Sequence, residues 1–159
     1  MKKLSLAILM LGLSAVVNAA GYGVIDLEKV VESSQYLKQQ NASLEASIKP
    51  QASKLEQLNK ELTALQKQSQ TQGTNLKQIE TQYQAKMTEF TTLQQSVQSR
   101  VQTTIQNTNK TFEARVKQAA EQLRQENSLD LVLNKNAALA FDSKYDLTDK
   151  MIQKVNAIK

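Results

Sequence analysis

Residue types that carry catalytic chemistry are scarce in this 159-residue chain, which contains no His and no Cys. Their absence excludes a Ser-His-Asp triad, a Cys-His dyad, the common zinc sites and any disulfide bond. The four Gly are scattered along the chain, so no glycine-rich loop is available to hold a phosphate group. The acidic residues between positions 35 and 127 are spread among Gln and Lys, which is typical of a solvated helix face. We therefore expect no enzymatic activity, no metal and no cofactor.

Charge is the more informative chemistry in the middle of the chain. No acidic residue lies between Glu61 and Glu80, whereas Lys67 and Lys77 do. One interpretation is a positively charged site that attracts an acidic polypeptide or an anionic lipid headgroup by electrostatic steering. The other is a solvated turn between two helices, and the sequence leaves both open.

The elements that position these lysines are predicted from apolar spacing. Residues 35–127 hold a Leu repeat at intervals of three and four, and a second stripe with the same spacing runs from Leu76 to Leu123. This periodicity predicts a long antiparallel hairpin of two amphipathic helices with its tip near residues 70–75. Reflection about that tip places Leu62 opposite Ala85. Pro50 is expected to kink the first helix, and Asn75 to cap the second.

The two ends of the chain predict a small head that anchors this arm. Residues 20–34 contain a strand at 22–26 and a short helix at 27–33, and residues 128–159 complete the head. In the second segment we expect a β-hairpin of strands 129–133 and 137–141, then a helix with Asp146 as its N-cap. The hydrophobic core that these short elements can form is small compared with the long arm that it must anchor. Small domains commonly gain stability by oligomerisation, so we expect the head to be an oligomerisation domain. The fold class is therefore mostly α with a small β part.

The first 19 residues have the pattern of a secretory signal peptide. Lys2 and Lys3 precede a short apolar run, and the run ends at Val17-Asn18-Ala19, with small residues where a signal peptidase cleaves. The apolar run is shorter than the roughly 20 residues that a membrane-spanning helix needs. We expect cleavage after Ala19 or Ala20 and export of the remaining chain.

Both ends resemble the Skp/OmpH family of periplasmic chaperones. The matching segments are Gly23-Val24-Ile25-Asp26-Leu27-Glu28-Lys29-Val30, the run from Leu129 to Phe141, and Asp146-Leu147-Thr148-Asp149. The resemblance implies a jellyfish-like homotrimer in the periplasm, with three helical arms around a cavity. It also implies ATP-independent binding of unfolded outer-membrane proteins, which prevents their aggregation in transit to the outer membrane.

Candidate site residues follow from that resemblance and from side-chain size. The trimerisation head is expected to use Val24, Ile25, Leu131, Val132, Leu133, Leu139 and Phe141. Contact with an unfolded client protein is expected from Lys67, Lys77, Tyr83, Met87, Phe90 and Phe112, although most of the apolar stripe must form the seam of the hairpin itself. Two alternatives remain: a structural coiled-coil protein of the cell envelope, and an envelope protein that binds lipid or lipopolysaccharide. No nucleic-acid partner is expected.

Overall fold

The computed structural model describes residues 21–71 and 75–159. The predicted signal peptide and Gly73, at the predicted tip, lie outside the described residues. The chain runs through a short strand and helix, two very long helices, a second short strand and a closing helix. Their bounds are β1 Tyr22–Ile25, α1 Leu27–Ser33, α2 Gln35–Gln68, α3 Leu76–Glu126, β2 Leu131–Asn134 and α4 Thr148–Ala157.

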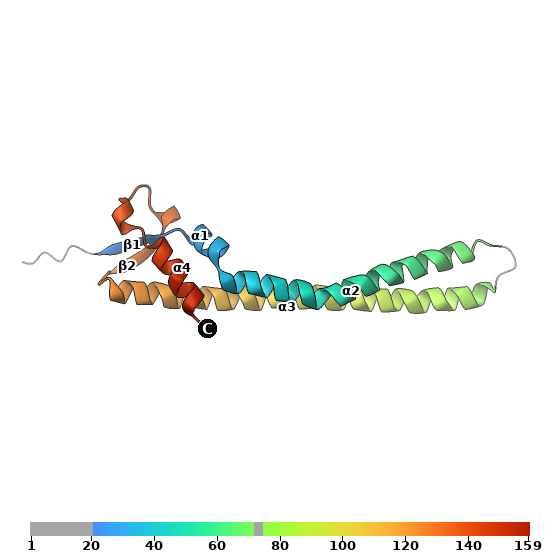
Figure 1. Cartoon of the computed structure of the whole chain (residues 1–159). Coiled ribbons are helices and arrows are strands. Elements are labelled where there is room, and N and C mark those ends of the chain that lie inside the picture. The colour runs from blue at the N-terminus through green and yellow to red at the C-terminus, as the bar shows by residue number, and fades with distance from the viewer. Residues whose placement is uncertain (1–20, 72–74) are drawn as a thin grey trace, which may run out of the picture.

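Helices α2 and α3 form the arm, which confirms the predicted helical hairpin (Figure 1). Their lengths of 34 and 51 residues correspond to about 50 and 75 Å at 1.5 Å per residue. Ser34 begins α2 by accepting a hydrogen bond from the amide of Leu37, and Asn75 begins α3 by accepting one from the amide of Gln78. The cap predicted at Asn75 is confirmed.

Pro50 lies inside α2, where it supplies no amide hydrogen to the helix. The helix continues through it to Gln68, and Figure 1 shows α2 bending near its middle. Because α2 bends while α3 runs nearly straight, the two helices separate toward the tip.

The end of α3 returns the chain to β1. Ser128 adopts a left-handed conformation with φ of 51°. The amide of Leu129 donates to the carbonyl of Arg124, and that of Ser128 donates to the carbonyl of Gln125. These two bonds form a Schellman motif, which closes a helix and reverses the chain direction. The reversal places β2 beside β1 although more than a hundred residues separate them.

The sheet contains two parallel strands among the described residues, and its register pairs Tyr22 with Leu131 and Ile25 with Asn134. The predicted hairpin of residues 129–133 and 137–141 is therefore wrong. After β2 the chain forms a 3-10 turn, Lys135–Ala137, and residues 138–142 form no strand. The ion pair between Lys135 and Asp26, 3.2 Å long, holds this turn against the end of β1. Residues 137–141 thus do not fold back along β2, and Leu139 is fully exposed.

Helix α4 covers the sheet and crosses α3 and α1, which closes the core of the head (Figure 1). Its N-cap is Leu147, so the prediction of Asp146 in that position is wrong by one residue. Asp146 nevertheless accepts a hydrogen bond of 2.8 Å from the amide of Thr148. Gly23 allows close packing here, because a Cβ atom at that position would lie 2.5 Å from Leu147 Cδ1. The buried core consists of Ile25, Val30, Phe112, Ala119, Leu123, Leu147, Met151 and Val155.

Candidate functional site on the helical arm

The arm has little buried apolar surface. In its distal part the buried side chains are Leu58, Leu62 and Ile79, and close to the head they are Thr108 and Phe112. Between these groups no side chain of α2 before Leu58, and none of α3 from 80 to 107, is buried. The arm is therefore a thin helical pair with a largely solvated surface, as its Gln-rich composition predicts.

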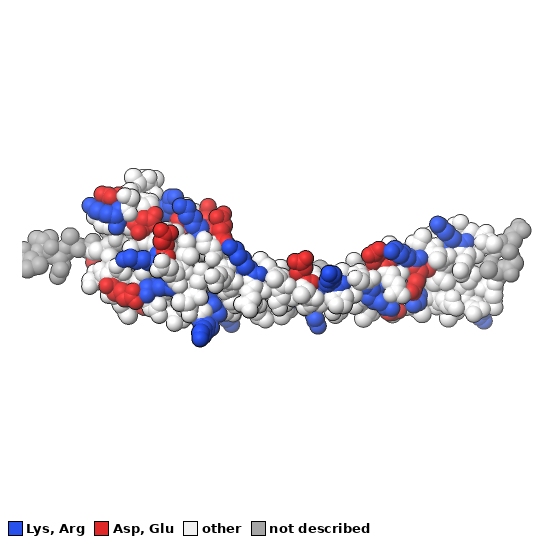
Figure 2. All heavy atoms as spheres, in the orientation of Figure 1, with Lys and Arg blue, Asp and Glu red and all other residues white. Residues whose placement is uncertain are grey.

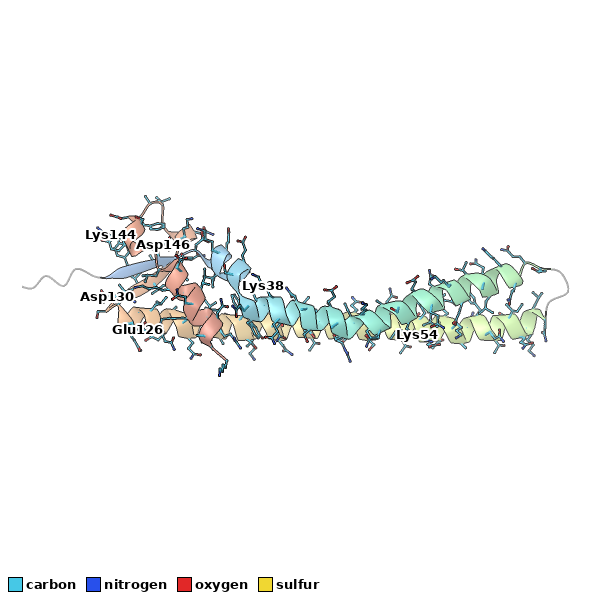
Figure 3. The ribbon with its side chains drawn as sticks, in the orientation of Figure 1. Lys38, Lys54, Glu126, Asp130, Lys144 and Asp146 are labelled. Atoms are coloured by element: carbon cyan, nitrogen blue, oxygen red, sulfur yellow. The ribbon has the colours of Figure 1, made fainter. Side chains whose placement is uncertain are left out.

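Four charged residues join the two helices in the distal half of the arm. Lys86 Nζ of α3 lies 2.6 Å from Glu61 Oε2 of α2, and Lys54 Nζ of α2 lies 3.2 Å from Glu89 Oε1 of α3. Lys86 also lies 3.8 Å from Glu89, which links the two pairs. Figure 2 shows red and blue atoms crowded together here, with a mostly white surface from there toward the tip. Lys54 is labelled in Figure 3.

The carboxylate of Glu61 is the most confined group of the four, since its Oε2 atom is buried. The contact with Lys86, and then the hydrogen bond from Gln57, lower the pKa of the Glu61 carboxyl. The same contact raises the pKa of Lys86. Both shifts favour the charged forms, so the pair stays ionised near neutral pH. The Glu61–Lys86 pair lies one residue along each helix from the predicted Leu62–Ala85 pair, in agreement with the predicted register.

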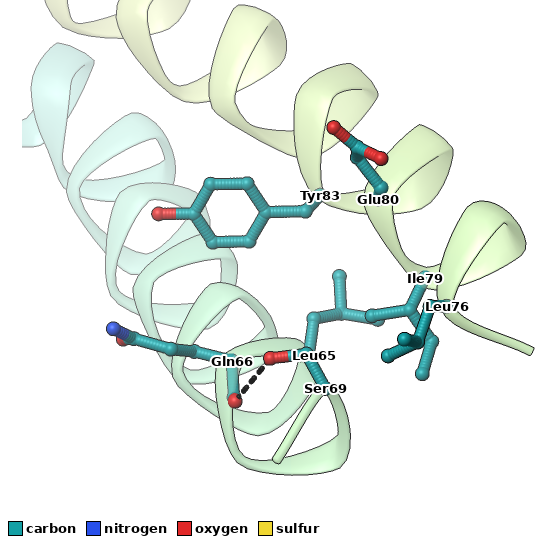
Figure 4. A pocket seen from close by; sticks show the side chains of 7 residues that line it. All are labelled: Leu65, Gln66, Ser69, Leu76, Ile79, Glu80 and Tyr83. Atoms are coloured by element: carbon teal, nitrogen blue, oxygen red, sulfur yellow. Dashed lines mark hydrogen bonds between the residues drawn. The ribbon is translucent and has the colours of Figure 1, made fainter. Parts of the chain in front are cut away.

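Beyond this charged group a hollow of about 330 Å³ opens between the helices near the tip (Figure 4). Tyr83 reaches from α3 toward α2, and Leu65 and Ile79 form apolar walls below it. The hollow is lined by Leu65, Gln66, Ser69, Leu76, Ile79, Glu80 and Tyr83. Its size suits an apolar side chain of a bound polypeptide, and its mixed lining favours weak and unspecific contact.

The structure separates the residues predicted to contact a client protein. Lys67 and Lys77 are exposed, and neither forms an ion pair with another described residue. Lys77 lines a different hollow from Leu76 and Ile79, so it faces away from the tip hollow. Tyr83, Met87 and Phe90 are half-buried along α3. Phe112 is only 9 % exposed within the head core, so its selection as a contact residue is wrong. Its helical spacing could not reveal that burial, because α1 and α4 provide part of that core.

The residues predicted for trimerisation also divide into two groups. Val24 and Ile25 are buried inside the single chain, and Val132 and Phe141 are half-buried. Leu131 and Leu133 are 41 % and 37 % exposed, and Leu139 is fully exposed. The exposed leucines follow or belong to β2, whose second edge has no strand partner among the described residues. Among the predicted set, these three leucines are the most exposed in the single chain.

Sequence reasoning did not identify the charged group of Lys54, Glu61, Lys86 and Glu89. The signal was available, because the predicted register places Glu61 almost opposite Lys86. Within residues 21–71 and 75–159 no group of His, Cys, Asp and Glu could hold a metal ion. No helix in the same ranges has the length and hydropathy needed to cross a membrane.

Together the fold and the arm define a protein with a long helical hairpin on a small α/β head. The chain belongs to the OmpH-like family, since the family model described as "Outer membrane protein (OmpH-like)" matches residues 21–155. A crystal structure of a proposed outer membrane chaperone (OmpH-like) from Caulobacter crescentus CB15 is similar, with a TM-score of 0.64 and 21 % identity. The alignment covers 87 % of this chain and 85 % of that one. No curated protein sequence matches this chain significantly.

Proposed function

We propose that this protein is an ATP-independent chaperone of the periplasm that binds unfolded outer-membrane proteins and prevents their aggregation. The main support is the arm, a long solvated helical pair with half-buried apolar side chains and an open hollow near its tip. Such a surface offers many weak contacts, which suits a protein that must release its client without ATP. Membership of the OmpH-like family and the description of the Caulobacter protein agree with this role.

We also propose that three copies assemble through the head after the signal peptide has been removed. The support is the edge of β2 that no other described strand pairs with, together with the exposure of Leu131, Leu133 and Leu139. An exposed apolar strand edge readily pairs with another chain. Three arms projecting from one such head would enclose a cavity for the client.

Suppression of aggregation tests the chaperone role. A urea-unfolded porin is diluted into buffer without nucleotide, and light scattering is recorded with and without this protein. We expect the scattering to fall toward the buffer baseline once assembled chaperone equals porin, because bound chains cannot meet one another. A structural spacer protein would leave the scattering unchanged. A lipid-binding protein would leave it unchanged too, and would sediment with anionic liposomes.

Charge reversal at Lys67 and Lys77 tests the proposed steering of clients. Replacing both by Glu changes each chain by four charge units, and exposed charges contribute little to stability. We expect the association rate with an acidic unfolded porin to fall by on the order of tenfold at low salt, and less at high salt. Stopped-flow fluorescence measures that rate. The matched control is the Lys110→Glu, Lys117→Glu variant, which makes the same charge change near the head. Equal rates for both variants would mean that the tip lysines have no special role.

A further inference from the structure

The buried contacts of the arm lie at its two ends. Leu58, Leu62 and Ile79 are the buried residues at the distal end, whereas the next buried residues of α3 are Thr108 and Phe112 near the head. The long middle section between them has no buried side chain in either helix. The distal end therefore has three buried apolar side chains, and no continuous core connects them to the head.

The middle section also shows features that weaken the contact between the helices. Pro50 interrupts the hydrogen bonding of α2 there. A hollow of about 170 Å³ lies between the helices closer to the head, and its lining mixes polar and apolar side chains. It is formed by Leu37, Gln40, Asn41, Leu44, Thr104, Ile105, Thr108 and Asn109. The two helices are consequently packed weakly against each other in the middle of the arm, so the core of the head does little to stabilise the tip.

The charged group described above lies beside two of these buried side chains, since Leu58 lies between Lys54 and Glu61 in α2 and Leu62 follows Glu61. Among the described residues, Lys54–Glu89 and Glu61–Lys86 are the ion pairs that connect α2 with α3. The other ion pairs within the arm, such as Glu56–Lys60 and Glu113–Lys117, join residues of one helix and cannot hold two helices together. The side chains of the cross-helix pairs are between 33 % and 46 % exposed, so they are only partly screened by solvent.

We propose that Lys54, Glu61, Lys86 and Glu89 form an ionic latch that holds the distal end of the arm closed over Leu58, Leu62 and Ile79. The latch fixes the register of α2 on α3 in the distal part of the arm, where few apolar side chains are buried between the helices. Its release separates the distal parts of α2 and α3 and exposes the three apolar side chains. The latch is a property of the fold, and it does not depend on the proposed chaperone function.

Hydrogen–deuterium exchange of the full exported chain tests the latch. In a Lys86→Gln variant we expect the amides of residues 58–68 and 76–90 to exchange about three- to tenfold faster, because the ion pairs of Lys86 with Glu61 and Glu89 are lost together. Exchange in α4 is expected to stay unchanged. High salt should accelerate the same amides in the original protein and have less effect on the variant. The matched control is Lys60→Gln, which removes an exposed ion pair within α2 and should change nothing at the tip.

A charge swap distinguishes two causes of faster exchange: loss of the ion pairs between the helices, and lower helix propensity of the substituted residue. Glu61→Lys alone places a third Lys beside Lys54 and Lys86, so it should accelerate exchange at least as much as Lys86→Gln. The fourfold variant Lys54→Glu, Glu61→Lys, Lys86→Glu and Glu89→Lys re-forms each ion pair with reversed signs, and we expect it to restore slow exchange. Two outcomes would overturn the proposal: equal exchange in Lys86→Gln and Lys60→Gln, or a fourfold variant that exchanges as fast as Glu61→Lys.

Discussion

A Leu131→Asp, Leu133→Asp variant is expected to sediment at equilibrium with the mass of one chain, whereas we expect the original protein to sediment with the mass of three. Both leucines are more than one-third exposed in the single chain, so their replacement leaves the buried core of the head intact. In a trimer the same positions would be covered by another chain, and each Asp would be a buried charge without a partner. Burying such charges costs more than a small interface can offset.

The control for this experiment is Leu76→Asp, since Leu76 is a 58 % exposed leucine on the arm far from the head. That variant should remain a trimer. Val132→Asp makes a useful contrast, because Val132 packs against the head core and its replacement should reduce helicity as well as assembly. A double Leu131, Leu133 variant that stays trimeric would place the interface elsewhere than on β2.

Leu123→Ala is expected to lower the free energy of unfolding of the head by about 2–5 kcal/mol. Leu123 is fully buried near the end of α3, in the core that α4 closes. The substitution removes apolar contact and leaves a cavity among Ala119, Met151 and Val155, which are also completely buried. For a chain of this size the melting temperature should fall by roughly 5–20 °C.

Thermal unfolding followed by circular dichroism measures this change, at a fixed protein concentration because assembly contributes to stability. Leu76→Ala is the matched control, since it removes the same atoms from an exposed position and should shift the melting temperature very little. Equal melting of both variants would mean that the head core does not determine the stability of the chain. The expected result would show that the head core contributes to the stability of the chain.

The arm is the part of this fold that the sequence predicts well. Its helices follow from an apolar residue at every third or fourth position, and the cap at Asn75 follows from a local side-chain preference. Even the register of the hairpin follows, because a short tip leaves two antiparallel helices little choice of alignment. The Glu61–Lys86 ion pair agrees with that register.

The head is the part of the fold whose strand pairing could not be predicted from local sequence patterns. Residues 129–141 have the composition of a β-hairpin, with an Asn-Lys-Asn turn between two apolar runs. The first run instead pairs with β1, which lies more than a hundred residues earlier in the chain. Local propensity cannot select between a neighbouring partner and a distant one, because the energy of a strand depends on the surface that it finally covers.

Burial was likewise decided by the tertiary structure. Phe112 and Phe90 occupy similar positions in the periodic pattern of α3, yet Phe112 lies in the head core and Phe90 stays half-exposed on the arm. The sequence by itself determined two long helices, the cap at Asn75 and the alignment of the helices, since these depend on residues close together in the chain or related by one turn. Only the tertiary structure decided the parallel sheet and which residues of the head are buried, because both depend on contacts between distant segments.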